Sequence, residues 1–494
     1  MLIFIGSFLF ISAELSYFSG SVFSMKPKLK VFEEFSQALL PHEARYLSSL
    51  AAFVDAEKEE IFSTLVHNAL NAESAKTFNP DFDKRKYHHI KTWVEKKLSQ
   101  RDVDKVGAWI MEFNKKLSLD LISASEEREM LDYIRNYKSI GFNFQQLYNV
   151  MKEYRSYLLM RLRYDDHIIV KDFLDRFASA FQKAVKIQEK LYEATSEITL
   201  QYTSKSNKTL YWEKWLRKVF ENEEINGINR YRAFILLAFM YNTEKNPQKL
   251  QKIFDQIDHF FSQGQMYCRR VLYNYYSSRV LLHSQLNDTE KAIYYGKLAV
   301  RQTNEDALMY VNNLVAIYLK TGQIREASEL LENYRPVYEN THNDLQKITY
   351  TSYYLRVLTE LNQLKKAENI GIYFLNKFET EIFEYRWHHF FTSYLTVLML
   401  QENYNEILLL ERKYGLNALE AKTSFVPNLS WIIALSSYME SKIDKDMLFT
   451  SIADSLSVLK HSPANFSIIS NNAEKLIIAL PELRVLFKSY IVGK

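Results

Sequence analysis

The stretch that decides the fold is residues 308–335, which reads LMYVNNLVAIYLKTGQIREASELLENYR. Large apolar residues recur three and four positions apart before and after Gly322, and this spacing predicts two amphipathic helices. Gly322 allows the left-handed turn between them. Small residues such as Ala327 let the two helices approach closely, while the large ones fill the groove against a neighbouring pair. The segment therefore predicts one helix pair of a larger stack.

The same helix-pair pattern recurs through the second half of the chain. It closes each time on a small or aliphatic residue, at Leu250, Ala292, Ala327, Ala367, Ile407 and Met447. The intervals are 42, 35, 40, 40 and 40 residues. A period of this size predicts stacked helix pairs, because one pair cannot bury its apolar face alone.

This sequence pattern resembles a tetratricopeptide repeat. The family's places are occupied by Val311, Leu314, Tyr318, Gly322, Ala327 and Leu331. Val315 stands where the family has a small residue, and Tyr334 replaces the final alanine. Gly296 and Gly371 stand where two other units should have a large residue. The resemblance covers about residues 228–460. It implies a right-handed α-solenoid of about six units, with the first helix of each unit on the concave side.

The composition favours helices throughout. The 494 residues include only 11 Gly and 8 Pro, and no proline occurs between Pro80 and Pro247. Proline breaks helix interiors, so its absence favours long helices. We therefore predict an all-α protein, with a helical N-terminal domain followed by the tetratricopeptide-like α-solenoid. The predicted divisions are 1–25 (apolar leader or misassigned start), 26–205 (helical bundle ending in a long helix), 206–460 (repeat array) and 461–494 (capping helices).

In the first half, the spacing of apolar residues predicts seven helices. Their expected spans are 31–55, 56–71, 84–98, 101–120, 125–138, 143–164 and 166–203. In the last of them, apolar residues three and four apart form an unbroken seam over 170–198. One interpretation of the seam is a coiled coil that dimerises the protein. The other is a long helix packed inside its own domain, which its small alanines suit.

The N-terminus also has two interpretations. Residues 1–13 are almost wholly apolar but too short to span a membrane. They also lack the preceding Lys or Arg of a signal peptide. Met25 stands just before three lysines, where the helical pattern begins, so we expect a misassigned start and a cytoplasmic protein. The alternative is a signal peptide in residues 1–24 and an exported protein. No other segment is apolar enough to predict an integral membrane domain.

The sequence shows none of the common catalytic motifs. A Gly-rich phosphate loop, a zinc-protease helix and a nucleophile elbow are all missing. The single cysteine, Cys268, excludes an intrachain disulfide and a Cys-rich zinc site, and it suits a buried apolar position. Neighbouring helical residues point about 100° apart, so neither His88–His89 nor His388–His389 chelates one metal alone. The formal net charge of +4 is spread without a basic patch. We expect no catalysis, no cofactor, no metal and no nucleic-acid partner.

The candidate site is the inner face of the array, where the resemblance places the first helix of each unit. The polar residues at this phase are Asn274, Ser277, Ser278, Asn312, Asn313, Ser352, Arg356, His389, Thr392 and Ser393. Such side chains hydrogen-bond an extended peptide backbone, and Arg356 suits a carboxylate. The alternative is an ordinary solvated helix face.

The leading hypothesis is a non-catalytic scaffold or adaptor that binds a protein or peptide through the solenoid. The second is a bacterial signalling regulator, which senses a peptide or protein ligand through the repeats and acts through the helical N-terminal domain. The third, an enzyme with a site within residues 31–205, has no motif in its support.

Overall fold

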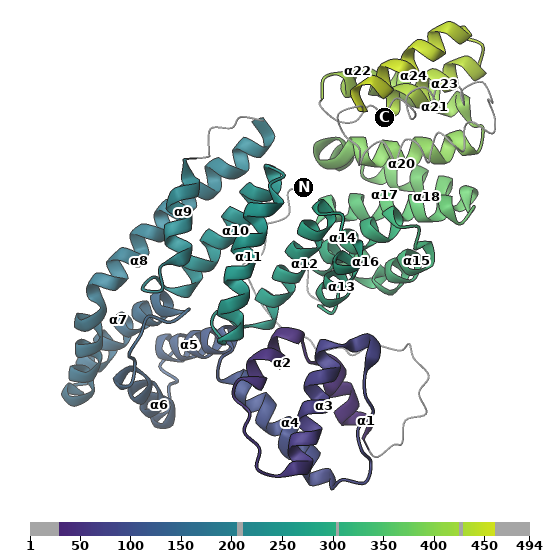
Figure 1. Cartoon of the computed structure of the whole chain (residues 1–494). Coiled ribbons are helices and arrows are strands. Elements are labelled where there is room, and N and C mark those ends of the chain that lie inside the picture. Colours follow the sequence, from purple (N-terminus) through teal and green to yellow (C-terminus); the bar gives the residue numbers. More distant parts are fainter. Residues whose placement is uncertain (1–28, 205–210, 303–305, 424–427, 460–494) are drawn as a thin grey trace. The chain divides into compact units, whose positions relative to one another are not determined.

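The computed structural model describes residues 29–204, 211–302, 306–423 and 428–459 (Figure 1). Over these ranges the chain forms helices and no strand, which confirms the all-α prediction. The chain divides into two compact units, unit 1 (Met1–Gln302) and unit 2 (Thr303–Lys494). The expected leader (1–25) and capping helices (461–494) lie outside the described residues and stay predictions.

Unit 1 is built from helices α1 to α13. Their bounds are α1 (Lys30–Ala38), α2 (Pro41–Ser48), α3 (Ala56–Leu70), α4 (Lys84–Ser99), α5 (Val103–Ser118), α6 (Ala124–Arg135), α7 (Phe144–Met160), α8 (Tyr164–Ser204), α9 (Trp212–Glu221), α10 (Gly227–Thr243), α11 (Pro247–Ser262), α12 (Arg269–Gln285) and α13 (Thr289–Ala299), with a short 3-10 helix η1 (Ala72–Ser74). The expected single helix over 31–55 is wrong. The chain ends α1 at Ala38 and restarts at Pro41, because proline favours the first position of a helix.

The predicted bundle surrounds a core between α5, α6, α7 and α8. Phe144, Tyr154 and Phe173 are fully enclosed in this core. The α8 seam is also buried, at Val170, Phe173, Ala184, Leu191, Ala194 and Ile198. It packs against α6, α7 and α10. The seam is therefore used inside unit 1, as the intramolecular interpretation expects.

Helix α2 ties the start of the described chain to helices 224 residues further on. The buried carboxylate of Glu43 accepts hydrogen bonds from Tyr267 Oη at 2.6 Å and from Arg269 Nε at 2.9 Å. His42, also buried, bonds to side chains of α11 and α12. These contacts explain why the first compact unit extends to Gln302 and includes α10 to α13, whereas the sequence suggested a boundary near residue 205.

Unit 2 continues as helix pairs. Its helices are α14 (Ala307–Lys320), α15 (Ile324–Asn333), α16 (Arg335–Asn340), α17 (Asp344–Glu360), α18 (Leu364–Lys377), α19 (Glu379–Glu381), the π-helix η2 (Ile382–Arg386), α20 (Trp387–Leu400), α21 (Tyr404–Tyr414), α22 (Leu416–Ala421), α23 (Leu429–Met439) and α24 (Lys445–Leu459). The first helices α14, α17, α20 and α23 pack side by side in succession, and α15, α18 and α21 each pack against two of them. Gly322 has φ 72°, the left-handed turn that the sequence predicts.

Six residues mark the same position in the predicted repeats, and their burial tests the predicted helical phase. Five are enclosed in the core, at Leu250, Ala292, Ala327, Ala367 and Ile407. The sixth is wrong, because Met447 is 57% exposed while its neighbour Leu448 is 2% exposed. The buried position of the last unit thus lies one residue later than the sequence spacing suggested.

Gly371 departs from the expected large residue for a steric reason. A Cβ at this position would lie 2.5 Å from Cε2 of Tyr394, on the facing helix α20. Tyr394 is almost fully enclosed and fills the space that a large residue at 371 would have taken. The glycine therefore admits a bulky partner from the next first helix.

Candidate functional site

The accessible face of the first helices in unit 2 is a stripe of half-buried residues three and four apart. The stripe consists of Met309, Asn313 and Ala316 on α14, Thr349, Tyr353 and Arg356 on α17, and His389, Thr392 and Thr396 on α20. It includes four of the predicted site residues: Asn313, Arg356, His389 and Thr392. These four residues thus share a half-buried face, and their role in binding stays a prediction.

The other predicted site residues of unit 2 are buried between helices, so their assignment to an accessible face is wrong. Asn312 donates from Nδ2 to the carbonyl oxygen of Gln346 at 3.2 Å and to its Oε1 at 3.0 Å. Ser352 and Ser393 each donate a hydroxyl to a backbone carbonyl one turn earlier in the same helix. The physical reason is that successive first helices pack directly on one another, which covers the side where these residues lie.

Three predicted site residues, Asn274, Ser277 and Ser278, lie on α12 in unit 1. Ser277 and Ser278 are buried, and the hydroxyl of Ser278 donates to the carbonyl of Asn274 at 2.9 Å. Their assignment to an accessible groove is wrong for the two serines. The three residues belong to a different compact unit from the stripe, and we do not treat them as one site with it.

Five residues of unit 2 form a polar group that we call the inner cluster: Tyr353, Arg356, Arg386, His389 and Thr392. The rings of Tyr353 and His389 meet edge to face, with centroids 4.9 Å apart and planes at 79°. Arg386 ends the π-helix η2, which packs against both α17 and α20. Its charge and that of Arg356 both act on Tyr353 and on His389. The cluster therefore joins side chains from three consecutive elements.

The electrostatics of the inner cluster are positive. Burial, with the positive charges of Arg356 and Arg386, lowers the pKa of His389 to about 3, so its imidazole is neutral at pH 7. Burial also lowers the pKa of Arg356 from its ordinary value, yet a guanidinium in a protein stays protonated. Within the described residues neither arginine has a carboxylate at ion-pair distance. The two guanidinium groups thus leave the cluster positive, with Glu360 acting on Arg356 only from beyond ion-pair distance.

Two polar atoms of the cluster have unused hydrogen-bonding capacity. Nε2 of His389 and Oγ1 of Thr392 are shielded from solvent and have no partner among the described residues. Enclosed polar atoms in folded proteins nearly always have a partner, so these two call for an explanation. The neighbouring His388 differs, because its Nε2 donates to Glu420 Oε1 at 2.6 Å. The two histidines therefore have different surroundings. The described ranges hold no cluster of three metal-ligating side chains.

Sequence reasoning missed Tyr353 and Arg386. Tyr353 lies one turn before Arg356 on the same stripe, so a corrected helical phase would have found it. Arg386 lies three residues before His389, so the same spacing admits it, but the sequence shows no sign of the π-helix in which it lies.

Unit 1 contains a second polar network, around His42. Its Nε2 lies 2.7 Å from Asp258 Oδ1, and its Nδ1 lies 2.9 Å from the hydroxyl of Tyr276. The arrangement resembles a proton relay, yet both ring nitrogens are already occupied and the imidazole is 4% exposed. The network has no nitrogen left for a substrate, so it joins helices and does not form a candidate catalytic site.

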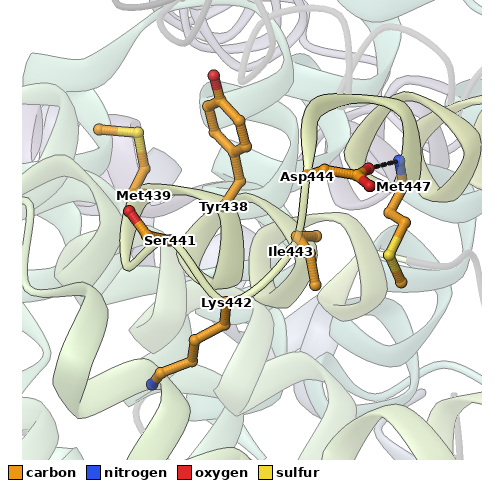
Figure 2. A pocket seen from close by; sticks show the side chains of 7 residues that line it. All are labelled: Tyr438, Met439, Ser441, Lys442, Ile443, Asp444 and Met447. Carbon is orange, nitrogen blue, oxygen red and sulfur yellow. Dashed lines mark hydrogen bonds between the residues drawn. The ribbon is translucent and has the colours of Figure 1, made fainter.

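A shallow hollow lies at the turn between α23 and α24 (Figure 2). It is lined by Tyr438, Met439, Ser441, Lys442, Ile443, Asp444 and Met447. Figure 2 shows the side chains of Tyr438 and Lys442 pointing in opposite directions. The one carboxylate of this set, Asp444, is already the acceptor for the backbone amide of Met447 at 2.8 Å. The hollow thus gathers no convergent set of functional groups.

None of the helices in the described ranges combines the length and the apolar character needed to cross a bilayer. Comparisons of the chain with protein-family models, with curated proteins and with solved structures found no match. The inner cluster of unit 2 is therefore the feature from which function has to be argued.

Proposed function

We propose that the chain is a non-catalytic scaffold that binds a protein or peptide through the inner stripe of unit 2, as a tetratricopeptide-like α-solenoid would. The side-by-side packing of α14, α17, α20 and α23 supports this proposal. The observation that carries it is the inner cluster, whose polar atoms are enclosed yet not consumed by internal bonding. Helical repeat arrays commonly bind partners along the face that their first helices line.

The test is affinity purification of the full-length protein beside an Arg356→Glu variant. Reversing this charge should release a stoichiometric partner, because the variant would repel the group that Arg356 holds in the complex. The matched control is Arg325→Glu, since Arg325 is an exposed arginine on α15, outside the stripe. Circular dichroism checks that both variants stay folded. Equal recovery of the same partners by wild type and both variants would remove the inner stripe as the binding face.

One observation favours the second candidate, a signalling regulator. The helical bundle belongs to unit 1, whereas α14 to α24 form a separate compact unit, so a ligand held by unit 2 has a distinct domain to act through. Small-angle scattering with and without the purified partner tests this. An unchanged scattering profile on saturation would count against a regulator and leave the scaffold.

A further inference from the structure

We propose that the inner cluster binds the carboxylate of an acidic side chain in an extended peptide, an assignment that rests on the proposed function and specifies its partner. Arg356 on α17 and Arg386 at the end of η2 supply the charge. Thr392 and His389 on α20 supply neutral hydrogen-bond donors.

Elsewhere several arginines of the protein pair with carboxylates. Arg163 donates to both carboxylate oxygens of Glu127 at 2.6 Å. Arg279, which is 4% exposed, donates to the carboxylate of Asp258. Shielding a guanidinium from water is costly unless its charge is paired and hydrogen-bonded. Arg356 departs from this pattern, because no carboxylate of the described residues lies at ion-pair distance from it, although Glu360 acts on it from further away.

Arg230 shows another way of accommodating such a group. Its Nε donates to the carbonyl of Phe220 at 3.0 Å, and its guanidinium lies 4.5 Å from the ring centroid of Phe260. Neither kind of contact is present for Arg356 or Arg386 within the described ranges. Both guanidinium groups thus have donors without a partner among the described residues, and a planar guanidinium matches a carboxylate with two parallel hydrogen bonds.

The unpartnered atoms of α20 complete the donor set. Oγ1 of Thr392 and Nε2 of His389 are both enclosed and unbonded among the described residues. A neutral imidazole with its hydrogen on Nε2 is a donor, and a threonine hydroxyl rotates to suit its partner. Thr392 lies three residues after His389, so both side chains share one face of α20. A ligand acceptor at this face would satisfy both atoms.

The π-helix places the second arginine. Five residues, Ile382–Arg386, form η2 directly before α20, and η2 packs against α17, which carries Arg356. The wider π turn is rare and is found frequently at functional sites. Here it brings Arg386 close enough to His389 for the arginine's charge to act on the imidazole.

The surrounding charges favour a carboxylate over a phosphate group. Glu360, one turn after Arg356 on α17, acts electrostatically on it, and Glu384 lies two residues before Arg386 in η2. Glu360 offsets part of the charge of Arg356, and a singly charged carboxylate needs less positive charge to balance it than a doubly charged phosphate. The ring of Tyr353 adds an apolar wall beside the cluster. The site therefore suits an acidic side chain carried on a peptide.

The experiment titrates the full-length protein into a fluorescein-labelled peptide of alternating glycine and glutamate with an amidated C-terminus, followed by anisotropy at low salt. We expect this peptide to bind and its glutamine counterpart to bind at least tenfold more weakly. Arg356→Gln and Arg386→Gln should each weaken the glutamate peptide about tenfold or more, because each removes a charged hydrogen-bond partner. Arg325→Gln on α15 removes the same charge outside the cluster and should leave affinity unchanged.

Other outcomes would overturn the assignment. Equal affinity for the glutamate and glutamine peptides, or no binding of either, would remove the carboxylate site. A glutamine peptide with a free C-terminus that binds as tightly as the glutamate peptide would assign the site to a terminal carboxylate instead. Displacement by inorganic phosphate at far lower concentration than by glutarate would assign it to phosphate. In all these cases the scaffold proposal stands if Arg356→Glu still releases a partner that Arg325→Glu retains.

Discussion

Replacing Glu420 with alanine should loosen the last helix pairs of unit 2. The carboxylate of Glu420, on α22, is enclosed and accepts hydrogen bonds from the backbone amides at the start of α23. These amides belong to Asn428, Leu429 and Ser430, at 2.9, 3.0 and 2.9 Å. It also accepts from Nε2 of His388 on α20 at 2.6 Å. One side chain thus caps α23 and joins three helices.

The expected loss follows from these contacts. Removing a helix N-cap costs about 1 kcal/mol, with a range of ~0.5–2. Leaving the largely buried His388 without its acceptor costs about 1–3 kcal/mol. The sum is about 3 kcal/mol, or roughly a hundredfold in the equilibrium for local opening. Glu420→Gln keeps the shape and one acceptor but loses the charge, so we expect about half of this loss.

The assay is hydrogen exchange of peptides that cover α22 and α23, read by mass spectrometry. A local readout is needed because two compact units need not unfold together. Glu329→Ala, at an exposed position on α15, is the matched control and should change nothing in these peptides. Unchanged protection of α23 in Glu420→Ala, with a native circular dichroism spectrum, would refute the capping argument.

The same residue predicts a pH dependence. Burial acts to raise the pKa of Glu420, but the hydrogen bonds from His388, Ser430 and Leu429 outweigh it and lower the pKa from its ordinary value of 4.5. Because the folded pKa is the lower one, the unfolded state binds the proton first on acidification. The stabilisation is therefore fully present above pH 4.5 and is lost as the pH falls from there through the folded pKa. Glu420→Gln should abolish this part of the acid sensitivity.

Three further predictions concern other contacts. Gly371→Ala should destabilise the protein by about 1–2 kcal/mol, because overpacking against Tyr394 outweighs the better helix propensity of alanine. Thermal unfolding measures this change, and a raised melting temperature would contradict it. His42→Ala should free α2 from α11 and α12, because it breaks the hydrogen bonds to Asp258 and Tyr276. Limited proteolysis should then cut faster near residue 40, and unchanged cleavage would contradict this prediction. Burial lowers the pKa of His42 below 6.5, so the unfolded state binds the proton first and thermal stability should decline as the pH falls below 6.5. His42→Gln should flatten that decline, and an equally steep one in the variant would contradict the assignment.

The helical class was predictable because it rests on local patterns. Scarce proline and glycine and regular apolar spacing recovered α3 (Ala56–Leu70) and α4 (Lys84–Ser99) almost to the residue. The extent of unit 1 was not predictable in this way. It depends on the bonds of His42 and Glu43 to residues more than 200 positions away, and no local periodicity encodes such pairings.

The candidate site shows where helical phase suffices and where it fails. Phase alone placed Arg356, His389 and Thr392 on the accessible stripe. Helical phase also placed Ser352 on this face. Ser352 is instead buried, because a small polar residue fits where adjacent helices nearly touch. Ser352 satisfies its own hydroxyl on a carbonyl of its helix and so tolerates burial. Sequence alone thus cannot tell a serine that faces a ligand from one that faces a neighbouring helix.

Arg386 marks a different limit, and it gives the cluster its second charge. The helical spacing admits Arg386, which lies three residues before His389, yet it does not reveal the π turn that precedes α20. The π turn of η2 shifts this register just before α20 begins, so the arginine reaches the cluster from an element with its own geometry.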